Sequence, residues 1–402
     1  MRGRAEMQGT ASGDGRAGPR RAAAWLRGPT TRALTVAGAG LAVVVAVLVS
    51  TVLSVTGPGG AARDPSGVTG DGSVAGDRYQ GQQQGQQQGQ QQGRQQGQRQ
   101  ASARKAMGQA APAPAPAANP GKCEDGKDPA ASLKPSGASG PAVKRIKERR
   151  NPDGSHGRLI VGVDQNSYLW GYRDPSSGRI EGFDIDLVRA IAKDLLGSKP
   201  QITYKTIPTD QRIPAVQKGE VDMVVRTMTV NCERIRQVAF STAYFEAGQQ
   251  LLAPKRGSGV TGFDSSLRGK RLCYAEGSTA QELMRGDGYK ALGARPVVVA
   301  NQLDCLVRLQ LGEADAVVTD NALAAGQAAQ DPSVHLIGKE PVTSEPYGVA
   351  MNLKDKDLVK RVNKVLDAYR GGGKGSKWQA SFDKWLADNM THTAPPKPKY
   401  RD

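Results

Sequence analysis

Residues 182–195 have the pattern of an amphipathic helix with a marked beginning, and few architectures can bury one face of such a helix. Leu187, Ile191 and Leu195 recur at a spacing near 3.6 residues, which places them on one side of a helix. Asp184 and Asp186 precede them, where the positive end of the helix dipole stabilises carboxylates. The stretch therefore predicts a helix that packs its apolar face against a second layer, with both carboxylates capping and orienting it.

Apolar strand-like runs and helical patterns alternate on both sides of this stretch. Such alternation predicts an α/β domain with a parallel sheet and helices on both of its faces. The predicted strands are residues 159–163, 202–207, 221–225, 270–274, 296–299 and 314–319, and the further predicted helices are residues 213–217, 279–284, 303–311, 354–370 and 377–387.

The first part of the chain is different in character. Residues 1–32 are basic and poor in core-forming residues, and they predict a disordered cytoplasmic tail. Residues 33–55 are 23 residues without a charge, long enough to cross a bilayer and long for a cleaved signal peptide. We expect an uncleaved signal anchor, with a cleaved signal as the alternative. Residues 56–145 predict a tether rich in Gly, Gln, Pro and Ala, followed by a pre-domain segment.

The charge and composition exclude several classes of function. The net charge is +17, but the basic residues are scattered and no zinc, helix-turn-helix or RNA-binding motif accompanies them. Aromatic residues make up only 5% of the chain, which argues against base-stacking surfaces. We therefore expect no nucleic-acid partner, and an anionic membrane or cell wall is the better partner for this charge. Because Cys-x-x-Cys is missing and there are three histidines, we expect no metal site and no cofactor.

Residues 182–187, Gly-Phe-Asp-Ile-Asp-Leu, are followed by Ala-Ile-Ala at residues 190–192. This motif resembles the signature of the family 3 extracellular solute-binding proteins, the polar amino acid receptors of ABC importers. The resemblance covers about residues 157–390. It implies a type II periplasmic-binding-protein fold with two lobes joined by two crossover hinge strands. The implied parts are lobe 1 at residues 155–247 plus 345–390 and lobe 2 at 248–344. The composition of residues 391–402 predicts a basic tail, loose over residues 395–402.

A free amino acid needs an arginine and further donors for its α-carboxylate and a carboxylate for its α-ammonium group. The resemblance assigns the carboxylate to Thr229 and Arg234, and to a second-lobe turn whose backbone N–H groups would cradle it. It assigns the ammonium group to Asp320. Without the family, these residues would read as a solvated arginine, a helix N-cap and a turn former. The ligand-binding residues that we expect are Asp164, Thr227, Thr229, Arg234, Gly277, Ser278, Thr279, Thr319 and Asp320.

The family contacts the ligand side chain with residues that follow the aspartate at position 164. Ser167 and Thr209 are polar where the glutamine-binding pattern has aromatic residues. Arg212 and Arg226 could favour an acidic side chain, although a solvated arginine is the commoner role. We rank glutamate, aspartate, glutamine and asparagine first and basic amino acids last. The possible selectivity residues are Ser167, Tyr168, Trp170, Thr209, Arg212 and Arg226.

Four cysteines stand on the outer side of the expected anchor, where two disulfides or four free thiols are possible. Three pairings exist. Cys273 and Cys305 fall on neighbouring elements of one lobe of the implied fold, so we predict that they pair with each other. Cys123 would then pair with Cys232 and clamp the pre-domain segment to the body.

The resemblance implies a monomeric, non-enzymatic receptor that closes on a small polar amino acid. It would present the ligand to an importer permease or a membrane sensor at the extracytoplasmic face, anchored by one N-terminal span or secreted if the signal is cleaved. Two alternatives remain open at this point. One is a cleft enzyme on the same fold, such as a dehydratase or a wall-cleaving transglycosylase. The other is a signalling module without a ligand.

Overall fold

The computed structural model describes residues 121–391 and 393–401. The expected cytoplasmic tail, the expected anchor at residues 33–55 and most of the expected tether lie outside the described residues. Within the described ranges, no helix has the length and apolarity that a membrane crossing requires.

Lobe 1 is built on a five-stranded sheet. The strands β2 and β6 are parallel, as are β2 and β7, but β16 is antiparallel to both of its neighbours. The prediction of a purely parallel sheet was therefore wrong, because the strand that returns from lobe 2 joins this sheet from the opposite direction. In spatial order the strands are β6 (Ile202–Thr206), β2 (Leu159–Val163), β7 (Met223–Val224), β16 (Ala350–Met351) and β8 (Ala239–Phe240).

Helices cover both faces of this sheet, as expected. The helix predicted at residues 182–195 is α3 (Phe183–Leu196), and Leu187, Ile191 and Leu195 are buried on its inner face. Each such side chain contributes about 1.5–3 kcal/mol when fully buried. The remaining elements of lobe 1 are the helices α2 (Pro141–Glu148), α4 (Arg212–Gln217), α9 (Lys356–Arg370) and α10 (Lys377–Trp385), with the short sheet of β3 (Asn166–Ser167), β4 (Gly171–Arg173) and β5 (Ile180–Glu181).

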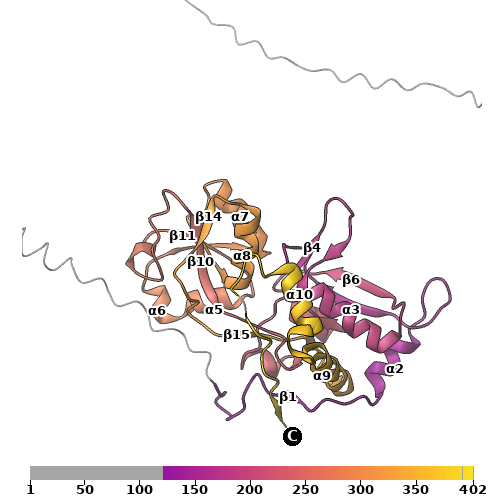
Figure 1. Ribbon diagram of the computed structural model, residues 1–402. Coiled ribbons are helices and arrows are strands. Elements are labelled where there is room, and N and C mark those ends of the chain that lie inside the picture. The colour runs from indigo at the N-terminus through magenta and orange to yellow at the C-terminus, as the bar shows by residue number, and fades with distance from the viewer. Residues whose placement is uncertain (1–120, 392, 402) are drawn as a thin grey trace, which may run out of the picture. The chain divides into compact units, whose positions relative to one another are not determined.

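Lobe 2 repeats this layered plan around a second mixed sheet. Strands β11, β12 and β13 run parallel, and β10 runs antiparallel to β13 and β14. Figure 1 shows the helices of this lobe around the sheet. The elements are β12 (Arg295–Val299), β11 (Arg271–Ala275), β13 (Ala316–Asp320), β10 (Gln249–Pro254) and β14 (Val334–Ile337) in spatial order, and the helices α5 (Thr279–Arg285), α6 (Asp287–Lys290), α7 (Gln302–Gln310) and α8 (Asn321–Gln330).

Two short strands carry the chain between the lobes. β9 (Phe245–Ala247) leaves lobe 1 and β15 (Glu345–Tyr347) returns to it, and the two pair with each other in antiparallel fashion. β15 is buried throughout, and in β9 Phe245 and Ala247 are buried on either side of the exposed Glu246. The crossing point is therefore a defined hinge rather than a loose linker. The two-lobed α/β architecture with two crossover strands is therefore confirmed.

The segments at the two ends of the described chain pack together against lobe 1. β1 (Ser132–Leu133) pairs in parallel with β17 (Tyr400–Arg401), and the Tyr400 hydroxyl donates to Asp367 Oδ1 at 2.5 Å. The expectation of a loose segment at residues 395–402 was therefore wrong, since Tyr400 and Arg401 form a paired strand. The pre-domain segment also reaches further into the body than expected, because α2 buries Val143 and Ile146 in the core of lobe 1.

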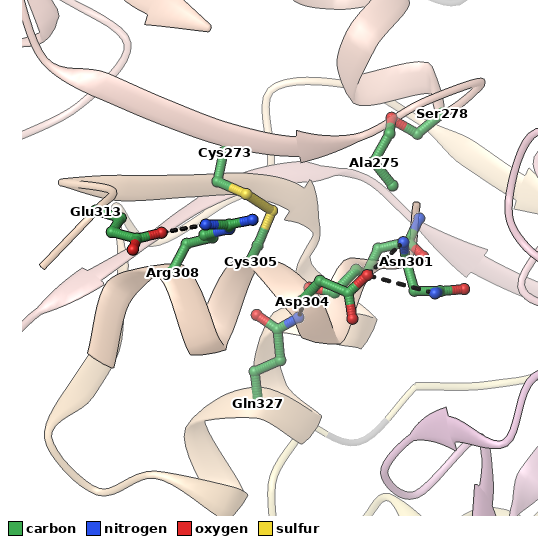
Figure 2. The surroundings of a disulfide bond; sticks show 10 residues. Cys273, Ala275, Ser278, Asn301, Asp304, Cys305, Arg308, Glu313 and Gln327 are labelled. Atoms are coloured by element: carbon green, nitrogen blue, oxygen red, sulfur yellow. Dashed lines mark hydrogen bonds and ion pairs between the residues drawn. A yellow bond between two sulfur atoms is a disulfide. The ribbon is translucent and has the colours of Figure 1, made fainter. Parts of the chain in front are cut away.

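Both predicted disulfides are present, Cys123–Cys232 and Cys273–Cys305. Figure 2 shows the second, which joins β11 to α7 inside lobe 2 beside the capping interaction of Asn301 and Asp304. Cys273 and Cys305 are fully buried, whereas Cys123 and Cys232 are partly exposed. The Cys273–Cys305 bond thus lies within a core, and the Cys123–Cys232 bond lies near the surface, two residues before Arg234.

Candidate functional site

Arg234 lies in a short 3-10 helix, Arg234–Arg236, that faces the other lobe. Its side chain is buried, in contrast to the solvated role that is commoner for such an arginine. Nη1 donates to the Thr229 carbonyl at 3.0 Å, and Nη2 donates across the lobes to the Gly277 carbonyl at 3.2 Å. Glu282 of α5 forms an ion pair with Nη2 at 3.2 Å. The guanidinium is therefore held at the boundary between the lobes.

Thr227 and Thr229 occupy the strand end that precedes this arginine. Thr229 forms an isolated bridge with Tyr347 of the hinge strand β15, so its position is tied to the crossing point. Thr227 has a φ of 40°, which is a strained backbone conformation for a β-branched residue. The buried Asp184 accepts a hydrogen bond from the Thr227 amide at 2.9 Å and from the Tyr244 hydroxyl at 2.8 Å.

Asp184 therefore does not cap its helix, as the sequence suggested; Gly182 is the N-cap residue, without a side-chain cap. Asp184 instead holds the strained backbone beside the site. Asp186 ties α3 to α10, because its Oδ2 accepts from Trp385 Nε1 at 2.7 Å. Burial raises the pKa of Asp184 to about 7, against the lowering effect of its hydrogen bonds from Tyr244 and Thr227.

The second-lobe turn differs from the expected anion cradle. Ser278 is the N-cap of α5, with its Oγ accepting from the Gln281 amide at 3.1 Å. The Gly277 amide donates to Gln281 Oε1, and the Ser278 amide donates to the Ala275 carbonyl. In this arrangement both amides are bonded within lobe 2, and the backbone cradle at these two residues stays a prediction.

Gly277 has a different role, which is close contact between the lobes. Its φ is 68°, and a Cβ built on it would lie 2.9 Å from Cα of Asp210 in lobe 1. Its carbonyl accepts from Nη2 of both Arg212 and Arg234, each at 3.2 Å. A side chain at this position would therefore hold the lobes apart.

Asp320 stands at the end of β13 and is buried. Gln249 Nε2 donates to its Oδ1, and the Tyr347 hydroxyl donates to its Oδ2 at 2.5 Å. Burial first, and then the nearby negative charge of Glu345, raises the pKa of Asp320 to about 7. A cation placed beside this carboxylate would relieve both effects.

Gln249, Tyr347 and Gln302 are residues that sequence reasoning missed. Gln249 begins β10 directly opposite Asp320 in the antiparallel register, and its Nε2 also donates to Thr279 Oγ1 at 3.1 Å. A polar pair, Gln249 and Gln250, at the start of an otherwise apolar strand was the signal that could have revealed it. Nothing in the local sequence marks Tyr347, because its role depends on the hinge pairing.

Arg212 is buried on α4 and faces the same space. Its guanidinium donates to three backbone carbonyls, those of Thr209 at 2.8 Å, Gly277 at 3.2 Å and Arg226 at 3.5 Å. Burial, and then the positive charges of Arg234 and Arg226, holds the pKa of Arg212 well below its usual value. The expectation that it is a solvated arginine was wrong.

Arg226 is also buried, but it has a carboxylate partner. Its Nη2 lies 2.9 Å from Asp164 Oδ2, and the two side chains are 1% and 4% exposed. Nη1 donates to Thr209 Oγ1 at 3.0 Å, and Asp164 Oδ2 also accepts from Ser167 Oγ at 2.8 Å. These residues form a supporting network behind the site. Solvation was the wrong expectation for Arg226 as well.

The side chains from both lobes enclose one polar cavity. The space that it leaves for the centre of a water molecule is about 10 Å³, enough for about one water. An amino acid therefore needs the lobes to part before it can bind. The lining residues are Arg212, Thr227, Thr229, Arg234, Ser278, Thr279, Ala280, Gln302, Val318, Thr319 and Asp320.

Most of the expected ligand-binding residues are in this lining, but Asp164 and Gly277 are outside it. Of the possible selectivity residues Arg212 lines the cavity, and Ser167, Tyr168, Trp170, Thr209 and Arg226 do not. Trp170 is fully buried in the core, where it packs edge-on against Phe183 and Phe245. Its Nε1 donates to the Ala322 carbonyl of lobe 2 at 3.0 Å. Trp170 therefore lies outside the cavity wall in this arrangement.

Within the described residues, no group of three or more His, Cys, Asp or Glu side chains could hold a metal ion. Two lobes on a paired-strand hinge, with arginines and an aspartate facing one cavity, define a protein that encloses a small charged ligand by lobe closure. Residues 159–388 match the model of the bacterial extracellular solute-binding proteins, family 3. The chain belongs to this family.

Individual relatives agree with this assignment. The glutamine-binding protein GlnH of a Bacillus subtilis ABC transporter is 36% identical over 232 residues, covering 58% of this chain and 82% of that protein. The L-glutamate/L-aspartate-binding protein of Pseudomonas aeruginosa is 29% identical over 262 residues, covering 63% and 82%. Among solved structures, an ancestral arginine-binding protein bound to arginine superposes with a TM-score of 0.52 at 34% identity, covering 58% of this chain and 99% of that chain.

Proposed function

We propose that this chain is an extracytoplasmic receptor that closes on an acidic amino acid, glutamate or aspartate, and presents it to an ABC importer. The relatives named above support an amino acid ligand, since they are named for glutamine and for glutamate and aspartate. Arg234 and Thr229 would bind the α-carboxylate from lobe 1. Asp320 would bind the α-ammonium group from lobe 2, where its carboxylate now accepts from Gln249 and Tyr347.

The observation that carries the choice of an acidic ligand is the state of Arg212. It is a buried cation in the cavity lining whose hydrogen bonds run to neutral carbonyls, and its pKa is held well below the usual value. A buried guanidinium without a carboxylate is costly, and a ligand carboxylate would form the strong bidentate pair that it lacks. Arg226 cannot supply the same attraction, because Asp164 already neutralises it.

Calorimetry on the full-length chain with L-glutamate, L-aspartate, L-glutamine and L-asparagine tests the proposal. We expect the two acids to bind at least ten-fold more tightly than their amides. Arg212→Met keeps an unbranched, flexible side chain but removes the charge, and we expect it to weaken glutamate binding by about 2 kcal/mol or more, some 30-fold. Glutamine binding should change much less.

The matched control is Arg236→Met, which removes an exposed arginine from the same segment as Arg234. It should leave all four affinities within about two-fold. Preference of the wild-type protein for glutamine, or an equal loss for all four ligands in Arg212→Met, would contradict an acidic ligand. Failure of all four to bind at 1 mM would contradict the receptor itself.

The proposal also covers the location, the oligomeric state, the partner and the lack of enzymatic activity. We place the protein at the extracytoplasmic face as a monomer held by residues 33–55, with a membrane sensor as the alternative partner to a permease. We also propose that it is not an enzyme, in keeping with the binding proteins among its relatives. Nuclear magnetic resonance of glutamate kept with the protein should show the ligand unchanged, and any turnover would favour a cleft enzyme instead.

A further inference from the structure

Glu282, on the first turns of α5 in lobe 2, directs its carboxylate into lobe 1. Oε1 lies 3.2 Å from Arg234 Nη2, and Oε2 accepts from Asn231 Nδ2 at 3.1 Å. The family resemblance assigned no role to Glu282 or Asn231. Both contacts join residues of opposite lobes, so they exist only while the lobes are together.

The lobe 1 half of this contact is fixed in advance. Asn231 Oδ1 accepts from the Arg234 amide at 2.9 Å, which leaves its Nδ2 pointing outward to Glu282. The next residue, Cys232, is bonded to Cys123. The Arg234 guanidinium is held by the Thr229 carbonyl at 3.0 Å. Because these donors are already oriented, they lose little further conformational freedom when Glu282 binds them.

Glu282 meets Arg234 from the outside of the cavity. Arg234 is in the wall of the inner cavity and also of a wider cleft outside it, whereas Glu282 is in the wall of the outer cleft alone. The Glu282 side chain is 42% exposed and that of Arg234 is 4% exposed. A ligand carboxylate on the inner side and Glu282 on the outer side can therefore share one guanidinium.

We propose that Glu282 is a closing latch: its carboxylate binds Asn231 and Arg234 only when the lobes are closed, and it thereby raises the affinity for the amino acid. The effect on affinity rests on the proposed function, but the effect on closure does not. A contact present in the closed form alone shifts the population toward that form, and the apparent affinity rises with the closed fraction. For a half-exposed pair the expected size is about three-fold.

Hydrogen exchange of the Thr209 amide reports closure without a label, because this amide donates across the lobes to the Ala300 carbonyl at 3.3 Å. Glu282→Gln keeps the shape of the side chain but loses the charge. In the ligand-free full-length chain it should speed exchange at Thr209 about three-fold, and glutamate should bind about three-fold more weakly. Glu313→Gln is the matched control, since Glu313 pairs with Arg308 inside lobe 2 (Figure 2). It should change neither quantity.

Rescue separates a latch from a general structural role. Asn231→Asp keeps the acceptor for the Arg234 amide but sets a second carboxylate against Glu282, so it should weaken closure more than Glu282→Gln does. Combining both substitutions restores a donor and an acceptor in exchanged positions, and closure should recover.

Three results would overturn the latch: unchanged Thr209 exchange in Glu282→Gln, tighter glutamate binding in that variant, or no recovery in the double variant. Tighter binding would mean that Glu282 competes with the ligand for Arg234. If the wild-type protein binds no amino acid, the proposed function fails, while Thr209 exchange still decides whether the latch exists.

Discussion

Ligand affinity should depend on pH through Asp320. Its carboxyl has a pKa of about 7 because it is buried beside Glu345. Only the ionised form can accept an ammonium group, so the carboxyl must lose its proton when the ligand binds. The apparent affinity should therefore rise with pH and level off above the pKa.

The size of the effect follows from the ionised fraction. With a pKa of about 7, about 90% of Asp320 is ionised at pH 8 and about 3% at pH 5.5. Affinity should thus fall about 30-fold between these values, which corresponds to about 2 kcal/mol. The side-chain carboxyl of glutamate, with a pKa of about 4.3, stays ionised throughout this range.

Calorimetry in buffers of different ionisation enthalpy measures the affinity and the number of protons released per bound ligand at once. We expect about half a proton to be released per ligand at pH 7 and nearly one at pH 5.5. Asp320→Asn should bind weakly at every pH and release no proton at this site. Equal affinity at pH 5.5 and 8 with no proton release in the wild-type protein would refute the reasoning, because Asp320 would then be ionised before the ligand arrives.

Three further perturbations have definite expected outcomes. Gly277→Ala should weaken glutamate binding at least ten-fold by calorimetry, because its Cβ would lie 2.9 Å from an atom of lobe 1. The control is Gly312→Ala, since Gly312 has a similar φ of 67° and no atom within 4 Å of the added Cβ, and it should leave binding unchanged. Equal losses of affinity in the two variants would contradict a steric role for position 277. Serine at Cys123 and Cys232 should loosen the loop before Arg234, for which we propose a role in binding the ligand carboxylate, and weaken binding several-fold. Unchanged calorimetric affinity would mean that the bond only tethers the segment. Ionisation of Asp184 should lower the wild-type free energy of unfolding by up to about 1.4 kcal/mol per pH unit between about pH 4 and 7. In urea unfolding, Asp184→Asn should make this pH dependence less steep, and a dependence identical to wild type would refute a raised pKa of Asp184.

The sign of the last effect follows from proton binding. The pKa of Asp184 is about 7 in the folded protein, against 3.8 for an unperturbed aspartate. Between these values the folded state holds the proton and the unfolded state does not. The stabilising contribution is therefore fully present below pH 4 and is lost as the pH rises through 7.

Local features of the sequence predicted the elements well. The helix at residues 182–195 was placed within one residue, because its periodicity and its glycine boundaries act within the segment itself. Arg234 and Asp320 came from a family resemblance, and the structure brings both to one cavity. The cysteine pairing could also be predicted, since Cys273 and Cys305 fall on elements that are neighbours in the implied fold.

What the sequence missed depends on contacts between distant segments. The burial of Arg212 results from the approach of Gly277, 65 residues further on, and no pattern around α4 reports it. Trp170 looks like a ligand contact beside Asp164, but the core of lobe 1 and the Ala322 carbonyl of lobe 2 surround it. The pairing of β17 with β1 likewise joins opposite ends of the folded body.

The disulfide between Cys123 and Cys232 has a mechanical consequence. Tension applied to the chain on the N-terminal side of Cys123 passes through the sulfur atoms to Cys232, and so bypasses the 109-residue separation between them. That loop contains β2, α3 and β6, the central elements of lobe 1. Such a pull would therefore leave this core unloaded and reach the body beside Arg234, at the edge of the cleft.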